Sequence, residues 1–164
     1  MRSNPTTGQR GFSLIELMIV LVLIGIVLRY GMPAFASYRL TLVENQTKSQ
    51  VLEDLRAARQ KAITRHVQVI VAFGNGVSTT NLTSYKIHTD TNADKLVTTG
   101  EWVSTENLPR DSKLERVTLT PTDTLIFDTS GMLKSGCSGG KIMLVTGTRR
   151  DTLAVSVAGI IYKP

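Results

Sequence analysis

Residues 12–28, FSLIELMIVLVLIGIVL, are mostly apolar and contain a single charged side chain, that of Glu16. As a helix continued to Ala36, this segment would be roughly 37 Å long at about 1.5 Å per residue, which exceeds the roughly 30 Å hydrocarbon core of a bilayer. A carboxylate in hydrocarbon is costly and is normally found with a partner. The segment therefore predicts a membrane-spanning helix, and Glu16 predicts a contact with a cationic group.

Basic residues on either side of this segment predict its orientation. Arg2 and Arg10 precede it and favour a cytoplasmic N-terminus. Arg29 follows it near the far edge of the hydrocarbon, where its side chain can reach the headgroups. The Ala34-x-Ala36 pattern also fits a cleaved secretory signal, but an acid near the start of the apolar run and helix-compatible sequence after Ala36 favour a retained anchor.

The stretch GFSLIELMIVLVLIGI resembles the class III signal of type IV pilins and type II secretion pseudopilins. In that family a basic leader ends in Gly, the mature chain begins with Phe, and a Glu follows within its first turn; Gly11, Phe12 and Glu16 match. The resemblance implies cleavage between Gly11 and Phe12 by a prepilin peptidase on the cytoplasmic side, and N-methylation of Phe12. Glu16 would then pair with the new amine of a neighbouring subunit. Pro33 matches a family proline, and we expect a helix kink there because proline cannot donate to the carbonyl of Arg29.

The chain after this segment reads as a helix followed by short strands. Residues 37–65 carry apolar side chains mostly at helical spacing, namely Leu42, Leu52, Leu55, Ala58, Ala62 and Ile63. After His66, β-branched and aromatic residues predict strands at 67–73, 84–88, 100–104, 114–119, 124–128, 141–146, 152–157 and 159–162. Residues 135–141 are glycine-rich and read as a flexible loop, and residues 146–151 read as a turn.

The order of these elements predicts an α+β fold. A long N-terminal helix, half transmembrane and half amphipathic, would pack on an antiparallel β-sheet domain. We divide the chain into a leader at 1–11, a transmembrane and assembly helix at 12–36, its amphipathic continuation at 37–66, and an antiparallel β domain at 67–164. The formal net charge of +6 permits anionic partners without requiring them.

The second half of the chain resembles the GspH/FimT minor pilins and pseudopilins. Their Ile-x-Phe-x-x-x-Gly pattern matches residues 126–131 only loosely, as IFDTSG. Some FimT-like members bind DNA through a C-terminal Gly-Arg-x-Arg motif, and the corresponding residues 159–162, GIIY, lack both arginines. Arg149 and Arg150, in the expected turn, are the nearest substitute and are candidates for a weak anion contact. DNA is therefore a possible partner that the sequence does not favour.

Residues with catalytic or metal-binding chemistry are few and scattered. His66 and His88 lack metal-ligand spacing, so we expect no metal. Cys137 is the single cysteine and cannot form an internal disulfide; a buried, inert thiol is the favoured interpretation over an intermolecular bridge or a reactive thiol. No nucleophile and base stand in a recognisable catalytic pattern, so we expect no enzymatic activity and no cofactor.

These features predict a filament subunit. The favoured function is a minor pilin of a type IV pilus assembled from the bacterial inner membrane, in its initiation or tip complex. Its expected partners are other pilin or pseudopilin subunits, the prepilin peptidase and the inner-membrane assembly platform. The chain would cross the membrane once, with its domain in the periplasm, before joining the fibre. A pseudopilin of type II secretion and a DNA-binding minor pilin for natural transformation are the alternatives.

Overall fold

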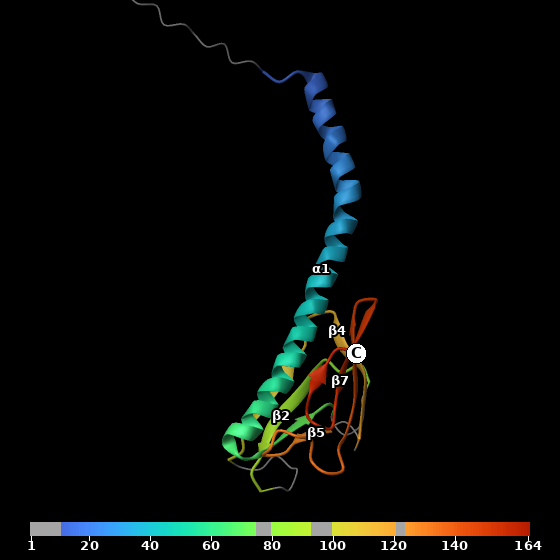
Figure 1. Ribbon diagram of the computed structural model, residues 1–164. Helices are drawn as coiled ribbons and strands as arrows, with labels where there is room; N and C mark the ends of the chain where they lie inside the picture. Colours follow the sequence, from blue (N-terminus) through green and yellow to red (C-terminus); the bar gives the residue numbers. More distant parts are fainter. Residues whose placement is uncertain (1–10, 75–79, 93–99, 121–123) are drawn as a thin grey trace, which may run out of the picture. The chain divides into compact units, whose positions relative to one another are not determined.

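One long helix, α1 (Leu14–Arg65), precedes all the strands of the computed structural model, which describes residues 11–74, 80–92, 100–120 and 124–164 (Figure 1). The chain separates into two compact units, Met1–Arg39 and Leu40–Pro164. The second unit contains the strands β1 (Gln68–Ala72), β2 (Ser84–Asp90), β3 (Val103–Asn107), β4 (Ser112–Thr120), β5 (Thr124–Phe127), β6 (Ser138–Thr146), β7 (Arg149–Val155) and β8 (Ile161–Tyr162).

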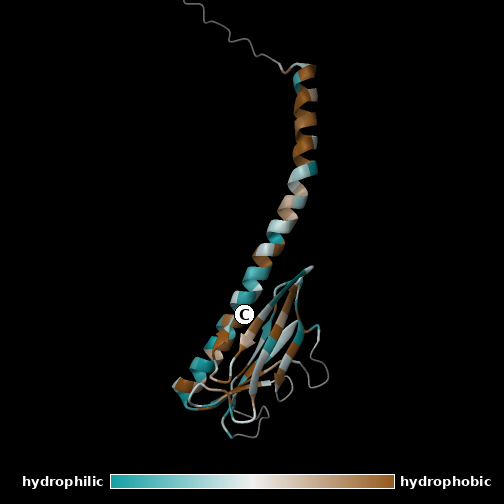
Figure 2. Cartoon of the chain, turned by 45° about the vertical axis from the view of Figure 1, so that its right-hand side comes forward, coloured by the Kyte–Doolittle hydropathy of each residue, from teal (hydrophilic) through white to brown (hydrophobic). Residues whose placement is uncertain are grey.

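In the first unit, α1 begins at Leu14, two residues after Phe12 of the predicted processing junction. Its first backbone hydrogen bond runs from the amide of Leu17 to the carbonyl of Ser13. The side chains of residues 14–39 are exposed, and Figure 2 shows that the first turns of α1 are the strongly hydrophobic ones. The helix is assigned without a break through Pro33, so proline does not end it, and the kink expected there stays a prediction.

In the second unit, α1 contributes a narrow buried stripe. The buried residues Thr47, Val51, Leu55, Ala58 and Ala62 follow one another at steps of three or four residues, as one face of a helix requires. Leu42, which its spacing places in this stripe, does not belong to it: its side chain is 49% exposed, so that prediction is wrong. The buried stripe of α1 begins at Thr47.

Two antiparallel sheets of four strands pack with this stripe. Their strand orders are β3-β2-β1-β5 and β4-β6-β7-β8, which we call sheet A and sheet B. Apolar residues from α1 and from both sheets form one buried core cluster, in which the rings of Phe73 and Tyr85 lie 5.5 Å apart. The expected α+β fold, a long helix packed on antiparallel strands, is confirmed.

The glycine-rich stretch before residue 141 differs from its prediction. Ser138, Gly139 and Gly140 belong to β6 rather than to a flexible loop. A Cβ on Gly139 would lie 1.8 Å from the carbonyl oxygen of Val155, and one on Gly140 would lie 1.8 Å from that of Thr118. Glycine is therefore needed here because neighbouring backbones approach closely, and not because the segment is a turn.

Candidate functional site

The predicted processing residues lie at the start of α1. Gly11 and Phe12 precede the helix, and the Phe12 side chain is 83% exposed. A Cβ on Gly11 would meet nothing within 4 Å, so the fold of the described residues does not itself require glycine there. Glu16 lies in the first helical turn, where the positive end of the helix dipole stabilises a carboxylate. Within the described ranges, Glu16 has no cationic partner.

The apolar surface that follows Glu16 is open. Within residues 11–74 and the other described ranges, one helix is long and apolar enough to cross a membrane, and its apolar window is unburied. Leu17, Leu21 and Leu28 are each more than half exposed. A contiguous apolar surface of this kind is characteristic of a membrane or protein contact.

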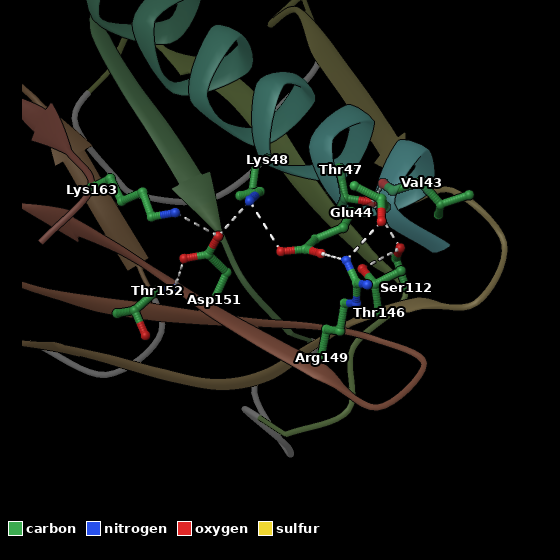
Figure 3. Close-up of polar contacts among 11 residues, drawn as sticks. Val43, Glu44, Thr47, Lys48, Ser112, Thr146, Arg149, Asp151, Thr152 and Lys163 are labelled. Carbon is green, nitrogen blue, oxygen red and sulfur yellow. Dashed lines mark hydrogen bonds and ion pairs between the residues drawn. The ribbon is translucent and has the colours of Figure 1, made fainter. Parts of the chain in front are cut away.

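Where α1 enters the second unit, charged side chains connect it to β7 and the C-terminus (Figure 3). The Nζ atom of Lys48 lies 3.1 Å from a carboxylate oxygen of Glu44 and 2.6 Å from one of Asp151. Arg149 approaches Glu44 at 3.2 Å and also donates to the hydroxyl of Thr41 at 2.8 Å. Lys163 approaches Asp151 at 3.2 Å. We call this set the collar network.

The collar network shifts the ionisation of its own members. Burial alone would raise the pKa of Glu44, but hydrogen bonds from Lys48 and Arg149 outweigh it and hold the pKa below its usual value of 4.5. Burial likewise opposes ionisation of Asp151, while hydrogen bonds from Lys48, the amide of Thr152 and Lys163 lower its pKa below 3.8. The hydrogen bond to Asp151 is the main cause that raises the pKa of Lys48. The charged forms are thus stabilised by folding.

A short chain of hydroxyl groups lies beside the collar network. Thr47 and Ser112 hydroxyls lie 2.7 Å apart, and Ser112 and Thr146 hydroxyls lie 3.0 Å apart. Thr47 also donates to the carbonyl of Val43 at 2.8 Å. These buried hydroxyl groups connect α1 to β4 and β6. Each one satisfies the hydrogen-bonding requirement of its neighbour.

Two further polar contacts fix α1 on the domain. The Tyr85 hydroxyl donates to a carboxylate oxygen of Asp54. Burial raises the pKa of Asp54 above its usual value of 3.8, and the nearby carboxylates of Glu106 and Glu53 act in the same direction, against the hydrogen bond. Arg59 donates from Nε to the carbonyl of Gly131 at 2.9 Å.

Gly131, the last residue of the IFDTSG pattern, has a structural reason to be glycine. Its φ of 77° lies in the left-handed region. A Cβ there would lie 2.6 Å from Cδ1 of Ile63. The pattern therefore marks where a turn packs closely against α1.

The sequence predicted a turn at Arg149 and Arg150, the two candidates for anion binding. That prediction is wrong, because both residues belong to β7. They lie on opposite faces of the strand. Arg149 faces Glu44 on α1, and Arg150 lies 2.7 Å from Glu115 on β4. Each guanidinium therefore has a carboxylate partner, and the two do not form one anion site.

The remaining candidates from the sequence lie apart from one another. Cys137 is buried, His66 is exposed at the end of α1, and His88 is buried in β2. Among the residues whose placement is described, no group of three or more His, Cys, Asp and Glu side chains is arranged to hold a metal. The sequence analysis missed the contact between Lys48 and Asp151, because nothing in a single sequence marks two residues so far apart as neighbours.

A family profile described as type II transport protein GspH matches residues 49–159, more than half of the chain. The chain belongs to the GspH family. The profile of the prokaryotic N-terminal methylation motif matches residues 6–28 of this GspH-family chain. No curated protein matches it.

The GspH-family chain also has a solved structural relative. The type IV minor pilin FimU of Pseudomonas aeruginosa aligns with a TM-score of 0.53 over 74% of this chain and 90% of its own, at 13% identity. At that identity the likeness concerns the fold. Family and fold are thus those of pilin-like structural subunits, which confirms the resemblance inferred from Gly11, Phe12 and Glu16.

The C-terminal end of this GspH-family domain differs from the arginine motif of DNA-binding relatives. The side chains of Ile160 and Tyr162 occupy the two arginine positions and are 53% and 49% exposed. The surface that would contact DNA there is uncharged at both positions.

Proposed function

We propose that this GspH-family chain is a minor subunit of a type IV pilus, made as a precursor in the bacterial inner membrane. Its domain would face the periplasm, and a prepilin peptidase would cleave between Gly11 and Phe12 before Phe12 is methylated. The observation that carries the proposal is the exposed apolar start of α1, in which Glu16 lacks a cationic partner among the described residues and lies four residues after Phe12.

The proposed assembly step is a transfer of α1 from lipid to neighbouring helices. Cleavage creates an ammonium group on Phe12, and methylation of that amine keeps its positive charge. In lipid, Glu16 has no partner within its own described chain; in a fibre, the Phe12 ammonium of a neighbour supplies one. An acidic residue in a membrane helix costs about 2.5–3.5 kcal/mol at the centre and less near an interface, so the pairing favours assembly.

The pilus and the secretion pseudopilus remain two candidate systems. The family description names type II transport, whereas the structural relative is a type IV minor pilin. We favour the pilus, with a place in the initiation or tip complex beside other minor pilins and the assembly platform. Deleting the gene separates the two: loss of surface fibres supports the pilus, and loss of secreted proteins with fibres intact supports the pseudopilus.

DNA uptake has less support than either system. Arg149 and Arg150 are each engaged by a carboxylate, and Ile160 and Tyr162 stand where DNA-binding relatives carry arginine. A DNA receptor would need a larger group of unpaired cations.

The proposal is tested by recovering fibres from cells by shearing and probing them for the chain. Wild-type chain should be present in the fibre fraction. Gly11→Val should leave the full precursor in the membrane, because the peptidase would no longer accept the junction. Gly25→Val is the matched control, since a Cβ at Gly25 also meets nothing within 4 Å. Wild-type chain absent from fibres, or Gly11→Val processed normally, would overturn the proposal.

A further inference from the structure

The outer face of sheet B, turned away from the core, carries a group of cations. Lys113 and Arg116 come from β4, Lys141 from β6 and Arg150 from β7, and all four are exposed. We call these four residues the basic face.

Strand register shows that the four residues share one side of the sheet. Lys113 and Arg150 both pair with Val145, one from each neighbouring strand. Arg116 pairs with Met143, two residues before Val145. Lys141 continues the same alternation along β6, whereas Ile142 and Leu144 between these positions are buried on the opposite side.

A β-bulge between Leu114 and Arg116 helps to place these charges. The register shift leaves Glu115 as the extra residue of β4, where its carboxylate reaches Arg150. Bulges re-aim side chains in this way. Glu115 is thus a carboxylate placed among these cations. Lys113, Arg116 and Lys141 have no carboxylate partner in the described part of the chain.

A surface of the opposite sign lies elsewhere on the same domain. Asp54 of α1 lies near Glu53 and Glu106, close enough for both carboxylates to raise its pKa. Glu106 pairs with Tyr85 across β2 and β3, and Tyr85 in turn donates to Asp54. The domain therefore carries both a cationic face and a group of carboxylates, which suits a heterologous contact between neighbouring subunits.

We propose that the basic face docks on a carboxylate-rich surface of a neighbouring filament subunit, of the kind that this chain carries at Glu53, Asp54 and Glu106. This inference rests on the proposed function, because it needs a filament in which domains meet side by side. Electrostatic complementarity would set which subunit is the neighbour more than how tightly it binds.

The composition of the face favours a protein over a nucleic acid. Three unpaired cations fall short of the six to ten phosphate contacts that are typical of proteins that bind duplex DNA strongly. Met143, Val145 and Thr118 lie among the cations and offer apolar and hydroxyl contacts rather than aromatic stacking.

Cross-linking of sheared fibres tests the contact directly. A zero-length carbodiimide joins a lysine amine to a carboxylate only where the two touch. We expect peptides in which Lys113 or Lys141 is joined to an Asp or Glu of another subunit, and none of these from the chain solubilised as a monomer in detergent. Cross-links that involve other lysines of the chain but neither of these two would overturn the inference.

A charge-reversal variant provides the second measurement. Lys113→Glu/Arg116→Glu/Lys141→Glu should lower incorporation into fibres by about tenfold or more, which corresponds to about 1.4 kcal/mol. Arg56→Glu/Arg65→Glu/Lys86→Glu changes the net charge equally on exposed residues away from the face and should incorporate normally. Equal amounts of both variants in the membrane, with equal resistance to protease, show that both fold.

The outcomes separate this inference from the proposed function. Wild-type chain in fibres together with normal incorporation of the basic-face variant refutes the docking surface alone. Wild-type chain absent from fibres refutes the proposed function as well. Normal incorporation of the variant combined with loss of duplex DNA binding, measured by mobility shift across a salt series, would assign the face to nucleic acid instead.

Discussion

Glu16 is the residue on which assembly depends in this account. Its carboxylate lies in an otherwise apolar helix surface, and the described residues of its own chain offer it no cation. A charge placed there is favourable only next to a neighbour that supplies the partner. In the proposed function, Glu16 would therefore link the processing of one subunit to the packing of the next.

Replacing Glu16 should separate membrane insertion from assembly. Glu16→Ala should insert and be cleaved normally, because neither step uses the carboxylate, but its incorporation into fibres should fall by about tenfold or more. Immunoblots of membrane and sheared-fibre fractions measure both steps. Leu17→Ala is the control for loss of a side chain at the next position. Normal incorporation of Glu16→Ala would refute the pairing.

Asp54 makes a residue-level prediction about pH. Its pKa is raised by folding, so the folded state binds the proton more tightly, and stability falls as pH rises through the raised pKa. Asp54→Asn should remove this fall while keeping an acceptor for the Tyr85 hydroxyl. The free energy of unfolding in urea, monitored by the fluorescence of Trp102 between about pH 4 and 7, checks this prediction. An unchanged slope of stability with pH would count against the assignment.

At the scale of elements, the collar network holds α1 to β7. Lys48→Met leaves Glu44 and Asp151 without their shared cation, and should lower the free energy of unfolding by about 1.5–3 kcal/mol. Lys86→Met, on an exposed lysine of β2, should change it by less than about 0.5 kcal/mol. Equal stabilities for the two variants would show that the collar network contributes nothing.

The same network predicts how acid affects the domain. The pKa values of Glu44 and Asp151 are lowered by folding, so their contribution is present above their usual values of 4.5 and 3.8 and is lost as pH falls through the lowered values. Lys48→Met should lose less stability on acidification than wild type does. Thermal unfolding at pH values on both sides of this range measures the difference, and parallel losses in both proteins would contradict the prediction.

The close contact between β4 and β6 depends on Gly140. Gly140→Ala should destabilise the domain by about 1–3 kcal/mol, because its methyl group would overlap the carbonyl of Thr118. Ser138→Ala, at an exposed position of the same strand, is the control. Thermal unfolding of both variants decides; a Gly140→Ala domain as stable as the control would show that the strands separate without cost.

Local pattern predicted the elements well and their contacts poorly. Helical spacing predicted the buried positions Leu55, Ala58 and Ala62, and β-branched and aromatic runs predicted a strand overlapping each observed one, because these periodicities belong to single segments. The bounds are less accurate: the strand expected at 100–104 lies at Val103–Asn107. The prediction of a loop at Gly139 and Gly140 is wrong, because glycine is required both in turns and where a neighbouring strand approaches closely. The sequence alone does not distinguish these two causes. The pairing of Lys48 with Asp151 depends on tertiary structure and had no local signal.

At the scale of the whole molecule, the chain consists of two parts with different surroundings. Residues 14–39 form an exposed helix with an apolar first part, as a membrane or protein contact would use, whereas Leu40–Pro164 contains its own core. The family and the fold identify the chain with pilin-like subunits. In the proposed function, the membrane and the fibre would be two environments for the same exposed helix.

We predict that the chain is processed as a prepilin and then joins a fibre. The intact mass of the chain recovered from sheared fibres tests it most directly. We predict the mass of residues 12–164 with one added methyl group on Phe12. A mass that still includes residues 1–11, or one that begins after Ala36 as a cleaved secretory signal would leave it, would contradict the account.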